Sequence, residues 1–116
     1  MSDVLADFLL ARIAEDEESA EREQVPVRNY GDGGWRTVPG RLKPGDRRLL
    51  AECEAKRQRI DAYRSAIVDE RMWSRRPDST AYHQAVARVS AWTFALATDA
   101  RTYADHEDYQ ESWRPA

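Results

Sequence analysis

The side chains best suited to chemistry gather near the end of the chain, in the stretch YADHEDYQESWRP over residues 103–115. Imidazole and carboxylate groups bind metal ions and act in acid–base catalysis. His106 stands there among four acidic residues: Asp105, Glu107, Asp108 and Glu111. Neighbours one or two positions apart on a helix point in different directions, so these groups do not converge on one ion. We therefore expect no metal site, and a metal-dependent hydrolase that joins His106 to His83 is the least favoured function.

Nucleophilic catalysis is not indicated either. Cys53, the single cysteine, falls on the apolar face of an expected helix, where a thiol packs as a small hydrophobic group. One cysteine excludes an internal disulfide and a zinc cluster of several cysteines within the monomer. No serine lies in a nucleophile-elbow motif. We therefore expect no catalytic residue and no cofactor.

The elements that must position these groups are mainly helical, because apolar residues recur at helical spacing along most of the chain. A glycine-rich turn between VRNY and WRTV predicts a β-hairpin instead. The predicted fold class is mainly α: a three-helix antiparallel bundle with a small β-hairpin insertion and a short C-terminal helix. We expect a single domain over residues 1–116, with helices over 2–22, 46–73 and 80–103, the hairpin over 27–38 and the short helix over 106–112.

Large apolar and aromatic side chains define the expected core and the anchoring of the C-terminal segment. Tyr103, Tyr109 and Trp113 are expected to pin this segment to the bundle, with Tyr103 and Trp113 substantially buried. Asp105 is the expected cap of the short helix, and Pro115 its stop. The expected core residues are Phe8, Leu9, Ile60, Ile67, Trp92 and Leu96.

The formal net charge of −3 hides a strong segregation along the chain. Residues 1–35 carry a net charge of −6, residues 36–76 carry +6, and residues 77–116 carry −3. Either the acidic ends fold against the basic middle and neutralise it, or the basic middle is exposed and binds nucleic acid. We favour the first of these two interpretations, because a nucleic-acid-binding module is more often basic overall.

Four residues are expected to form structural ion pairs. Arg12 and Asp16 are four positions apart on the first helix and share one face. Arg57 and Arg64, together with Arg71, recur every seven residues beside the apolar face of the second helix. An arginine in that position extends its head to water or meets a carboxylate across the helix interface, and Asp16 and the C-terminal acids are the candidate partners.

Two basic clusters are candidates for contact with nucleic acid or with a protein partner. They lie in RLKPGDRR and RMWSRR, at opposite ends of the second helix and about 40 Å apart along it. Trp73 in the second cluster could stack on a base. The candidate contact residues are Arg41, Lys43, Arg47, Arg48, Arg71, Trp73, Arg75 and Arg76.

Three stretches resemble a known family: DFLLARIAEDEESA, LLAECEAKRQRID and the closing YADHEDYQESWRP, with GGWR as a weaker fourth. The chain resembles a small domain of unknown function found in high-GC Gram-positive bacteria and their phages. The resemblance covers about half the chain in patches. It implies a bacterial or phage origin and a cytoplasmic site of action, but no activity, substrate or cofactor. Some members carry cysteines before the closing stretch; this chain has none there, so a zinc role is not implied.

These observations favour a non-enzymatic accessory protein that acts through a protein partner. The alternative is a nucleic-acid-binding accessory protein that uses segments 41–48 and 71–76. No apolar run is long enough to cross a membrane. A homodimer is compatible with the sequence, because the apolar face of the second helix exceeds what the other helices would cover.

Overall fold

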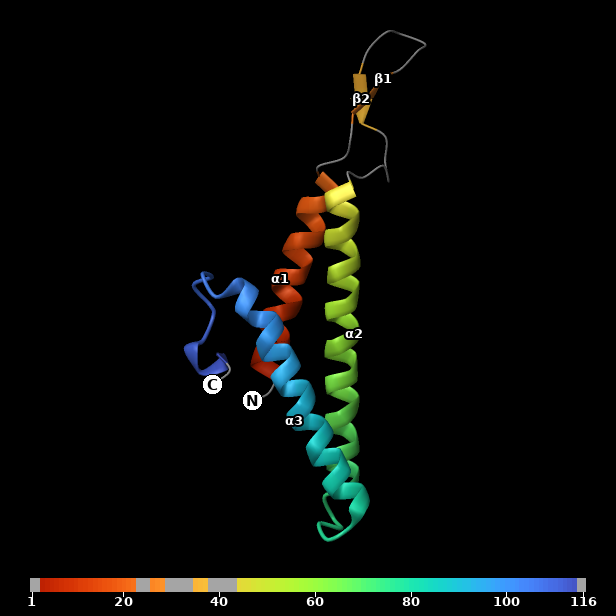
Figure 1. Cartoon of the computed structure of the whole chain (residues 1–116), viewed down its shortest axis with the longest axis vertical. Coiled ribbons are helices and arrows are strands. Elements are labelled where there is room, and N and C mark those ends of the chain that lie inside the picture. Colours follow the sequence, from red (N-terminus) through yellow and green to blue (C-terminus); the bar gives the residue numbers. More distant parts are fainter. Residues whose placement is uncertain (1–2, 23–25, 29–34, 38–43, 115–116) are drawn as a thin grey trace.

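The computed structural model describes residues 3–22, 26–28, 35–37 and 44–114, and the fold is mainly α as predicted. Figure 1 shows three helices that account for most of these residues. The elements in chain order are α1 (Asp3–Arg22), β1 (Pro26–Arg28), β2 (Trp35–Thr37), α2 (Pro44–Trp73), α3 (Thr80–Ala100), and the 3₁₀ turns η1 (Arg101–Tyr103) and η2 (Glu111–Trp113).

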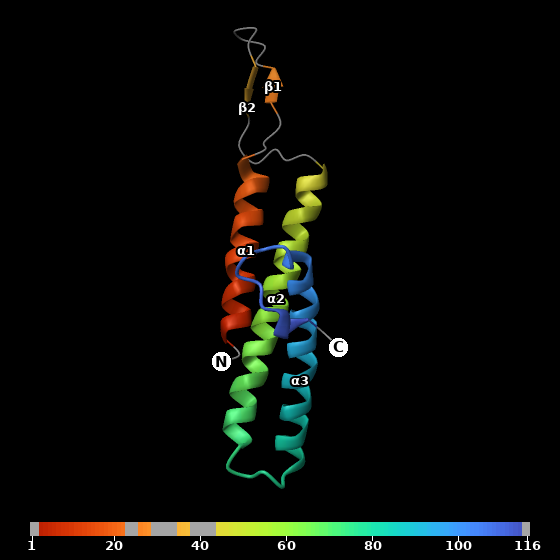
Figure 2. The same ribbon diagram turned by 90° about the vertical axis from the view of Figure 1, so that its left-hand side faces the viewer.

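The 30-residue helix α2 is the central support of the molecule. α1 runs beside its N-terminal half and α3 beside its C-terminal half, and the C-terminal segment crosses back over α1 (Figures 1 and 2). The ion pair between Asp7 and Arg64 places the first turns of α1 level with Arg64, in the C-terminal half of α2. Beyond that level α2 continues with only α3 beside it.

This arrangement divides the helices into two regions. We call residues 68–89 the two-helix tip, since they comprise the last turns of α2, the connection and the first turns of α3. The rest of the helices, with the C-terminal segment, form the three-helix body. At the tip Ser79 caps α3, because its side-chain oxygen accepts a hydrogen bond from the Tyr82 backbone N–H at 3.1 Å.

The hydrophobic core lies in the three-helix body. Phe8, Leu9, Ile60 and Leu96 are buried there as expected. Ile67 and Trp92 differ from expectation, since they are only partly buried against the core. The largest fully buried side chains are Tyr63, Leu9, Ile13, Ile60, Leu96 and Cys53.

The expected fold class is corrected in two of its details, and the first is the β-hairpin insertion over residues 27–38. β1 and β2 pair antiparallel over only three residues each, from Pro26 opposite Thr37 to Arg28 opposite Trp35. Two strands of this length form one small ladder and no layer that could add a core of its own. The fold is therefore an α-helical one rather than a bundle with a hairpin inserted. The glycine-rich residues 29–34 lie outside the described ranges.

The short C-terminal helix expected over residues 106–112 is also wrong. That segment consists of successive turns closed by bonds between residues three apart, such as His106 N–H to Tyr103 O and Tyr109 N–H to His106 O, and then η2. Three residues per turn align the rings of residues 103, 106 and 109 on one side, whereas in an α-helix each step of three would turn the direction of the side chain by about 60°. A helix of seven residues is also marginal by itself.

The helix boundaries shift for similar local reasons. α2 begins at Pro44 rather than at Asp46, since proline suits the first turn of a helix, where its missing N–H has no partner to lose. α3 ends at Ala100 rather than at Tyr103, and η1 continues the chain in a tighter coil.

Candidate partner-binding site

Phe8 of α1 is the centre of an aromatic cluster that fixes the C-terminal segment. Its ring centroid lies 5.0 Å from that of Trp113, 5.7 Å from His106, and 6.2 Å from both Tyr103 and Tyr109. Most of these rings meet edge to face, the arrangement that aromatic pairs prefer. We call these five residues the tail cluster. The expected anchors Tyr103, Tyr109 and Trp113 all lie in it, each partly buried against the core.

His106 accepts hydrogen bonds in this cluster. The Arg12 guanidinium donates to its imidazole, and the backbone N–H of Asp108 donates to Nδ1 at 3.0 Å. In this geometry Nδ1 of His106 is an acceptor for the backbone of its own turn. Across the described residues, no three histidine, cysteine or acidic side chains are grouped to hold a metal ion. His83 lies near the start of α3, a full helix away from His106.

Tyr103 connects the C-terminal segment to α1 and to α2. Its hydroxyl donates to Asp16 Oδ2 at 2.7 Å and accepts from Lys56 Nζ at 3.0 Å. Burial, and then the hydrogen bond to Asp16, raise the pKa of the Tyr103 phenol well above its usual range. The phenol therefore stays protonated at neutral pH and acts as a fixed donor. Lys56 also lies over the Tyr103 ring, 4.9 Å from its centroid.

The arginines that were expected to form ion pairs around α1 bind other carboxylates than the predicted ones. Arg12 pairs with Glu15 at 3.0 Å rather than with Asp16. Arg57 binds Glu17 through two hydrogen bonds of 3.2 and 2.5 Å, and this contact lowers the pKa of the Glu17 carboxyl.

Among the residues that the structure describes, Arg64 pairs with Asp7 alone, at 3.7 Å and with both side chains well exposed. The acidic first helix thus pairs with two of the arginines in the basic middle, Arg57 firmly and Arg64 loosely.

Sequence reasoning missed the firmest pair, between Arg59 of α2 and Asp99 of α3. Arg59 donates from Nε at 2.6 Å and from Nη2 at 3.1 Å to the two oxygens of the Asp99 carboxylate. A signal was available, since Asp99 is the only acidic residue in α3 and stands on the arc of that helix that faces the core. Such a position requires a cationic partner.

The two basic clusters lie apart at the ends of α2. Arg47 and Arg48 are exposed in its first turns, and Arg41 and Lys43 lie outside the described residues. Arg71, Trp73, Arg75 and Arg76 are exposed at the two-helix tip. Within the described part of the chain, none of these arginines forms an ion pair.

Cys53 is part of the core and shows no feature of a nucleophile. It is fully buried, and its thiol faces the Ile13 carbonyl oxygen at 4.0 Å. Burial, and then the nearby carboxylates of Asp16 and Glu17, raise the pKa of the thiol. The reactive thiolate is therefore disfavoured at neutral pH.

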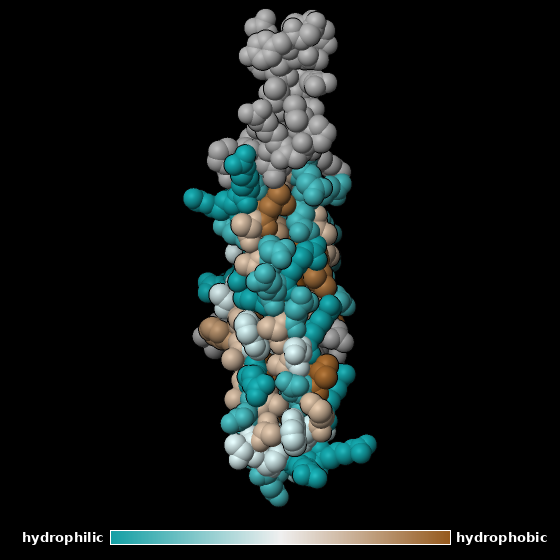
Figure 3. All heavy atoms as spheres, turned by 90° about the vertical axis from the view of Figure 1, so that its right-hand side faces the viewer, coloured by the Kyte–Doolittle hydropathy of each residue, from teal (hydrophilic) through white to brown (hydrophobic). Residues whose placement is uncertain are grey.

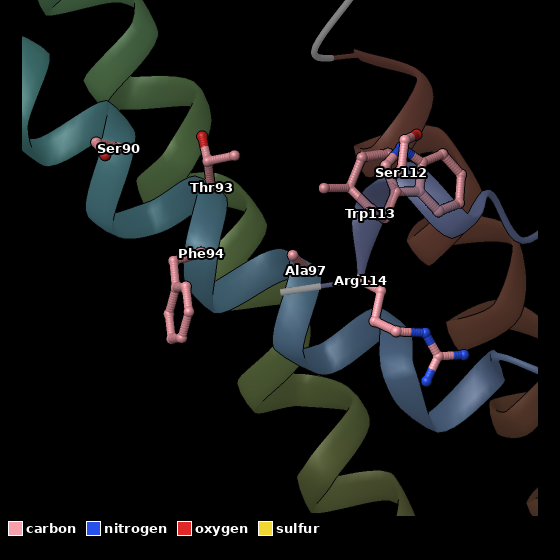
Figure 4. A pocket seen from close by; sticks show the side chains of 8 residues that line it. Ser90, Thr93, Phe94, Ala97, Ser112, Trp113 and Arg114 are labelled. Atoms are coloured by element: carbon pink, nitrogen blue, oxygen red, sulfur yellow. The ribbon is translucent and has the colours of Figure 1, made fainter. Parts of the chain in front are cut away.

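A pocket of about 390 Å³ lies between α3, the start of α1 and the C-terminal segment. Figure 4 shows that two elements contribute most of its lining: Thr93 and Phe94 come from α3, and Trp113 and Arg114 come from the C-terminal segment. Leu5 of α1, the two serines Ser90 and Ser112, and Ala97 complete it. The lining holds no carboxylate, histidine or cysteine, so it can bind an apolar group but has no acid–base pair.

The face of α3 next to this pocket is exposed and almost uncharged. Between Thr80 and Thr98, Arg88 is the only formally charged residue. Phe94, at the pocket rim, is 62% exposed, and Val86 two turns before it is also exposed. Exposed helix faces are normally rich in charged residues, so an uncharged face with a large aromatic side chain indicates a contact surface. The periodicity of α3 predicted its buried side but not this outer one.

Comparison with known proteins supports the resemblance seen in the sequence at the level of the family alone. Among the described residues no helix has a stretch long and apolar enough to cross a membrane. No curated protein and no solved structure matches the chain. A model described as a family of unknown function, DUF6221, matches residues 1–115, and the chain belongs to that family.

Proposed function

We propose that the protein is a small non-enzymatic interaction protein, which binds a segment of a partner protein in the groove between α3 and the C-terminal segment. The observation that supports this most is the exposed Phe94 at the rim of the pocket, on a helix face with a single charged residue. Large exposed aromatic side chains beside a pocket are typical of protein-binding surfaces. A cytoplasmic location in a bacterial or phage-infected cell belongs to the same proposal.

The lining of the pocket defines the chemistry of the partner segment. Trp113, Leu5 and Phe94 surround a volume that suits one or two apolar side chains. Arg114 stands at the pocket with Glu111 as its ion-pair partner at 3.0 Å, and its side chain is 46% exposed. An acidic residue in the partner can share this guanidinium. The expected partner segment therefore has an apolar anchor followed or preceded by an acidic residue.

A peptide selection tests this proposal without a known partner. A random peptide library is selected against the protein and counter-selected against Thr93→Arg, which places a long charged side chain in the pocket. Gln84→Arg is the matched control, because Gln84 is exposed on α3 and does not line the pocket. We expect peptides with an apolar anchor and an acidic residue that bind the protein and Gln84→Arg but not Thr93→Arg. A selection that yields no such peptides would contradict the proposal.

Nucleic-acid binding is the second candidate function, and one observation favours it. Arg71, Arg75 and Arg76 are exposed at the two-helix tip, without ion-pair partners among the described residues, and Trp73 lies between them. Phosphate contacts from such residues make binding strongly salt-dependent.

An electrophoretic shift of DNA or RNA oligonucleotides at low salt tests this second candidate. The shift should weaken in the Arg75→Ala/Arg76→Ala variant, while Arg101→Ala, which removes an exposed arginine of η1 outside both basic clusters, serves as the control. If no shift is seen at low salt, this second function is excluded.

A further inference from the structure

The pocket of the proposed binding site is one end of a longer groove, which continues along α3 into the two-helix tip. Ser90, Thr93 and Ala97 of α3 line the pocket. Val86 stands four positions before Ser90, so it lies on the same side of the helix, and it is 38% exposed. The α3 wall of the groove therefore extends over about three turns, from the buried Ala97 to the exposed Val86.

The second wall of the groove is the side of α2 that α1 covers in the body. Arg57 and Arg64 mark this side, because both pair with carboxylates of α1. Val68 and Met72 follow Arg64 at steps of four, below the start of α1 in Figures 1 and 2, and they are 61% and 62% exposed. Seen from the α2 side, hydrophilic side chains are denser over the body than toward the lower end, where the tip lies (Figure 3). Apolar side chains on adjacent turns of two helices thus line a groove that α1 leaves open.

The ion pair between Arg88 and Asp69 sets the level of one wall against the other. Since α2 and α3 are antiparallel, this pair places Val86 opposite Arg71 and the pocket opposite Arg64. From Arg64 to the end of α2 the groove has a length of about 14 Å. This length suits a helix of about two to three turns.

A cation at the edge of the groove defines the charge of its occupant. Arg71 follows Arg64 by seven positions, is exposed and forms no ion pair within the described part of the chain. In the body, the helix that lies on this side of α2 brings Glu17 to Arg57 and Asp7 to Arg64. A helix in the open part of the groove should therefore bring a carboxylate to Arg71.

We propose that the partner segment is an acidic amphipathic helix, which lies in this groove and covers the tip as α1 covers the body. Its apolar stripe packs on Val68, Met72 and Val86 and places one side chain in the pocket, and a carboxylate about seven residues from that side chain pairs with Arg71. A third helix suits a groove between two packed helices, because side chains of one helix fit between those of the others. This inference rests on the proposed function and adds the conformation, the length and the charge of the partner.

A peptide library with defined charges tests the pairing with Arg71. Each peptide has a helical frame with one apolar stripe, and each position beside the stripe holds Glu or Lys in equal shares. About two turns from the most strongly selected apolar residue, we expect Glu to be enriched by the protein and Lys by Arg71→Glu. Arg101→Glu is the matched control, because Arg101 is exposed in η1, outside the groove, and it should select Glu as the protein does. The same preference in Arg71→Glu as in the protein overturns the proposal.

The most enriched peptide then tests the apolar walls of the groove. Val68→Glu and Val86→Glu should each weaken its binding by about tenfold or more in fluorescence anisotropy, because each places a carboxylate against the acidic helix. Both positions are exposed, so these variants should fold, which circular dichroism of the free proteins checks. Gln84→Glu is the control, since Gln84 is exposed on the opposite side of α3 and should bind the peptide as the protein does. The peptide should also gain helical signal on binding.

The outcomes separate this inference from the proposed function. A peptide whose binding depends on Thr93 but not on Val68 or Val86 overturns the helix in the groove and leaves binding at the pocket intact. A molar mass of two chains in light scattering that Val68→Glu returns to one chain would place a second copy in the groove and overturn the proposal. Displacement of the peptide by a DNA oligonucleotide at low salt, lost in Arg71→Glu, would overturn it as well, because nucleic acid would then occupy Arg71.

Discussion

The three-helix body and the two-helix tip are built from the same pair of helices, α2 and α3, and differ in what covers them. In the body, Arg59 and Asp99 bridge the pair through two hydrogen bonds, and the Asp99 side chain is 16% exposed. At the tip, Arg88 and Asp69 make the corresponding bridge with one contact of 3.4 Å, and Asp69 is 36% exposed. A third layer therefore does more than bury apolar area, because it also tightens the polar contacts between the two helices that it covers.

The largest difference between the regions should appear when a leucine of the body is truncated. Leu96 is fully buried on α3, so Leu96→Ala should lower the free energy of unfolding by about 3 kcal/mol. Val86→Ala on the same helix, at the tip, should change it by less than about 0.5 kcal/mol. Urea denaturation at low protein concentration measures both without a contribution from association. Equal losses at the two positions would show that the tip is as well packed as the body.

The C-terminal segment extends this comparison, because it covers the body and leaves the tip open. Trp113 packs on Phe8 and Tyr109, so Trp113→Ala should lower the free energy of unfolding by about 2 kcal/mol. The loss should be smaller than at Leu96, because Trp113 is only partly buried. In addition, the buried Tyr109 hydroxyl has no hydrogen-bond partner among the described residues, and truncation of Trp113 would expose it to water. Trp73→Ala at the tip is the matched control. An unchanged melting temperature for Trp113→Ala would mean that the segment does not stabilise the body.

The two ion pairs between α2 and α3 provide a third comparison. Asp99→Ala should lower the free energy of unfolding by about 1–2 kcal/mol, since it leaves a half-buried Arg59 unpaired. Asp69→Ala should lower it by about 0.5 kcal/mol or less, as for an exposed pair. Thermal unfolding at low and at high salt separates them, because salt should reduce the effect of Asp69 much more than that of Asp99. Similar values for both would contradict the tightening of polar contacts by the third layer.

The smallest predicted effect concerns pH and the Tyr103 phenol. Its pKa is raised in the folded protein, so the folded state keeps the proton that the unfolded state loses near pH 10. The stabilisation is complete below that pH and declines as the pH rises further. The difference in unfolding free energy between the protein and Tyr103→Phe should therefore shrink between pH 7.5 and 10.5, by at most about 0.8 kcal/mol. A difference that stays constant or grows with pH would show that the Tyr103 phenol does not cause the pH dependence of the unfolding free energy. Tyr82→Phe on α3 is the control tyrosine.

The helices were predictable from the sequence because their signals are local and redundant. The apolar stripes of α1 and α3, Pro44 in the first turn of α2 and Pro77 after its end indicate where helices occur. Most core residues followed from the same stripes. The C-terminal segment was not predictable as turns, because the spacing of three between residues 103, 106 and 109 is compatible with an α-helix until the position of Phe8 is known.

The partners of charged residues and the pocket were less accessible from the sequence. Asp16 was expected to form ion pairs with arginines, but it accepts a hydrogen bond from the Tyr103 hydroxyl, and Glu17 binds Arg57 instead. A one-residue difference on α1 decides between them, and helix rotation at that precision depends on packing. The pocket involves Leu5, Thr93 and Trp113, which lie far apart in the chain, so only the path of the C-terminal segment over α1 creates it.

The return of the C-terminal segment to α1 also has a consequence for the order of folding. The contacts of Tyr103 with Asp16 and of His106 with Arg12 join residues 87 and 94 positions apart, nearly the full length of the chain. Loops of that length close slowly and at a high entropic cost, whereas α2 and α3 are joined by a short connection and can pair early. We therefore expect the α2–α3 hairpin to form first, with α1 and the C-terminal segment docking last and together, so that a chain still under synthesis displays its apolar tip before its first helix has a place to bind.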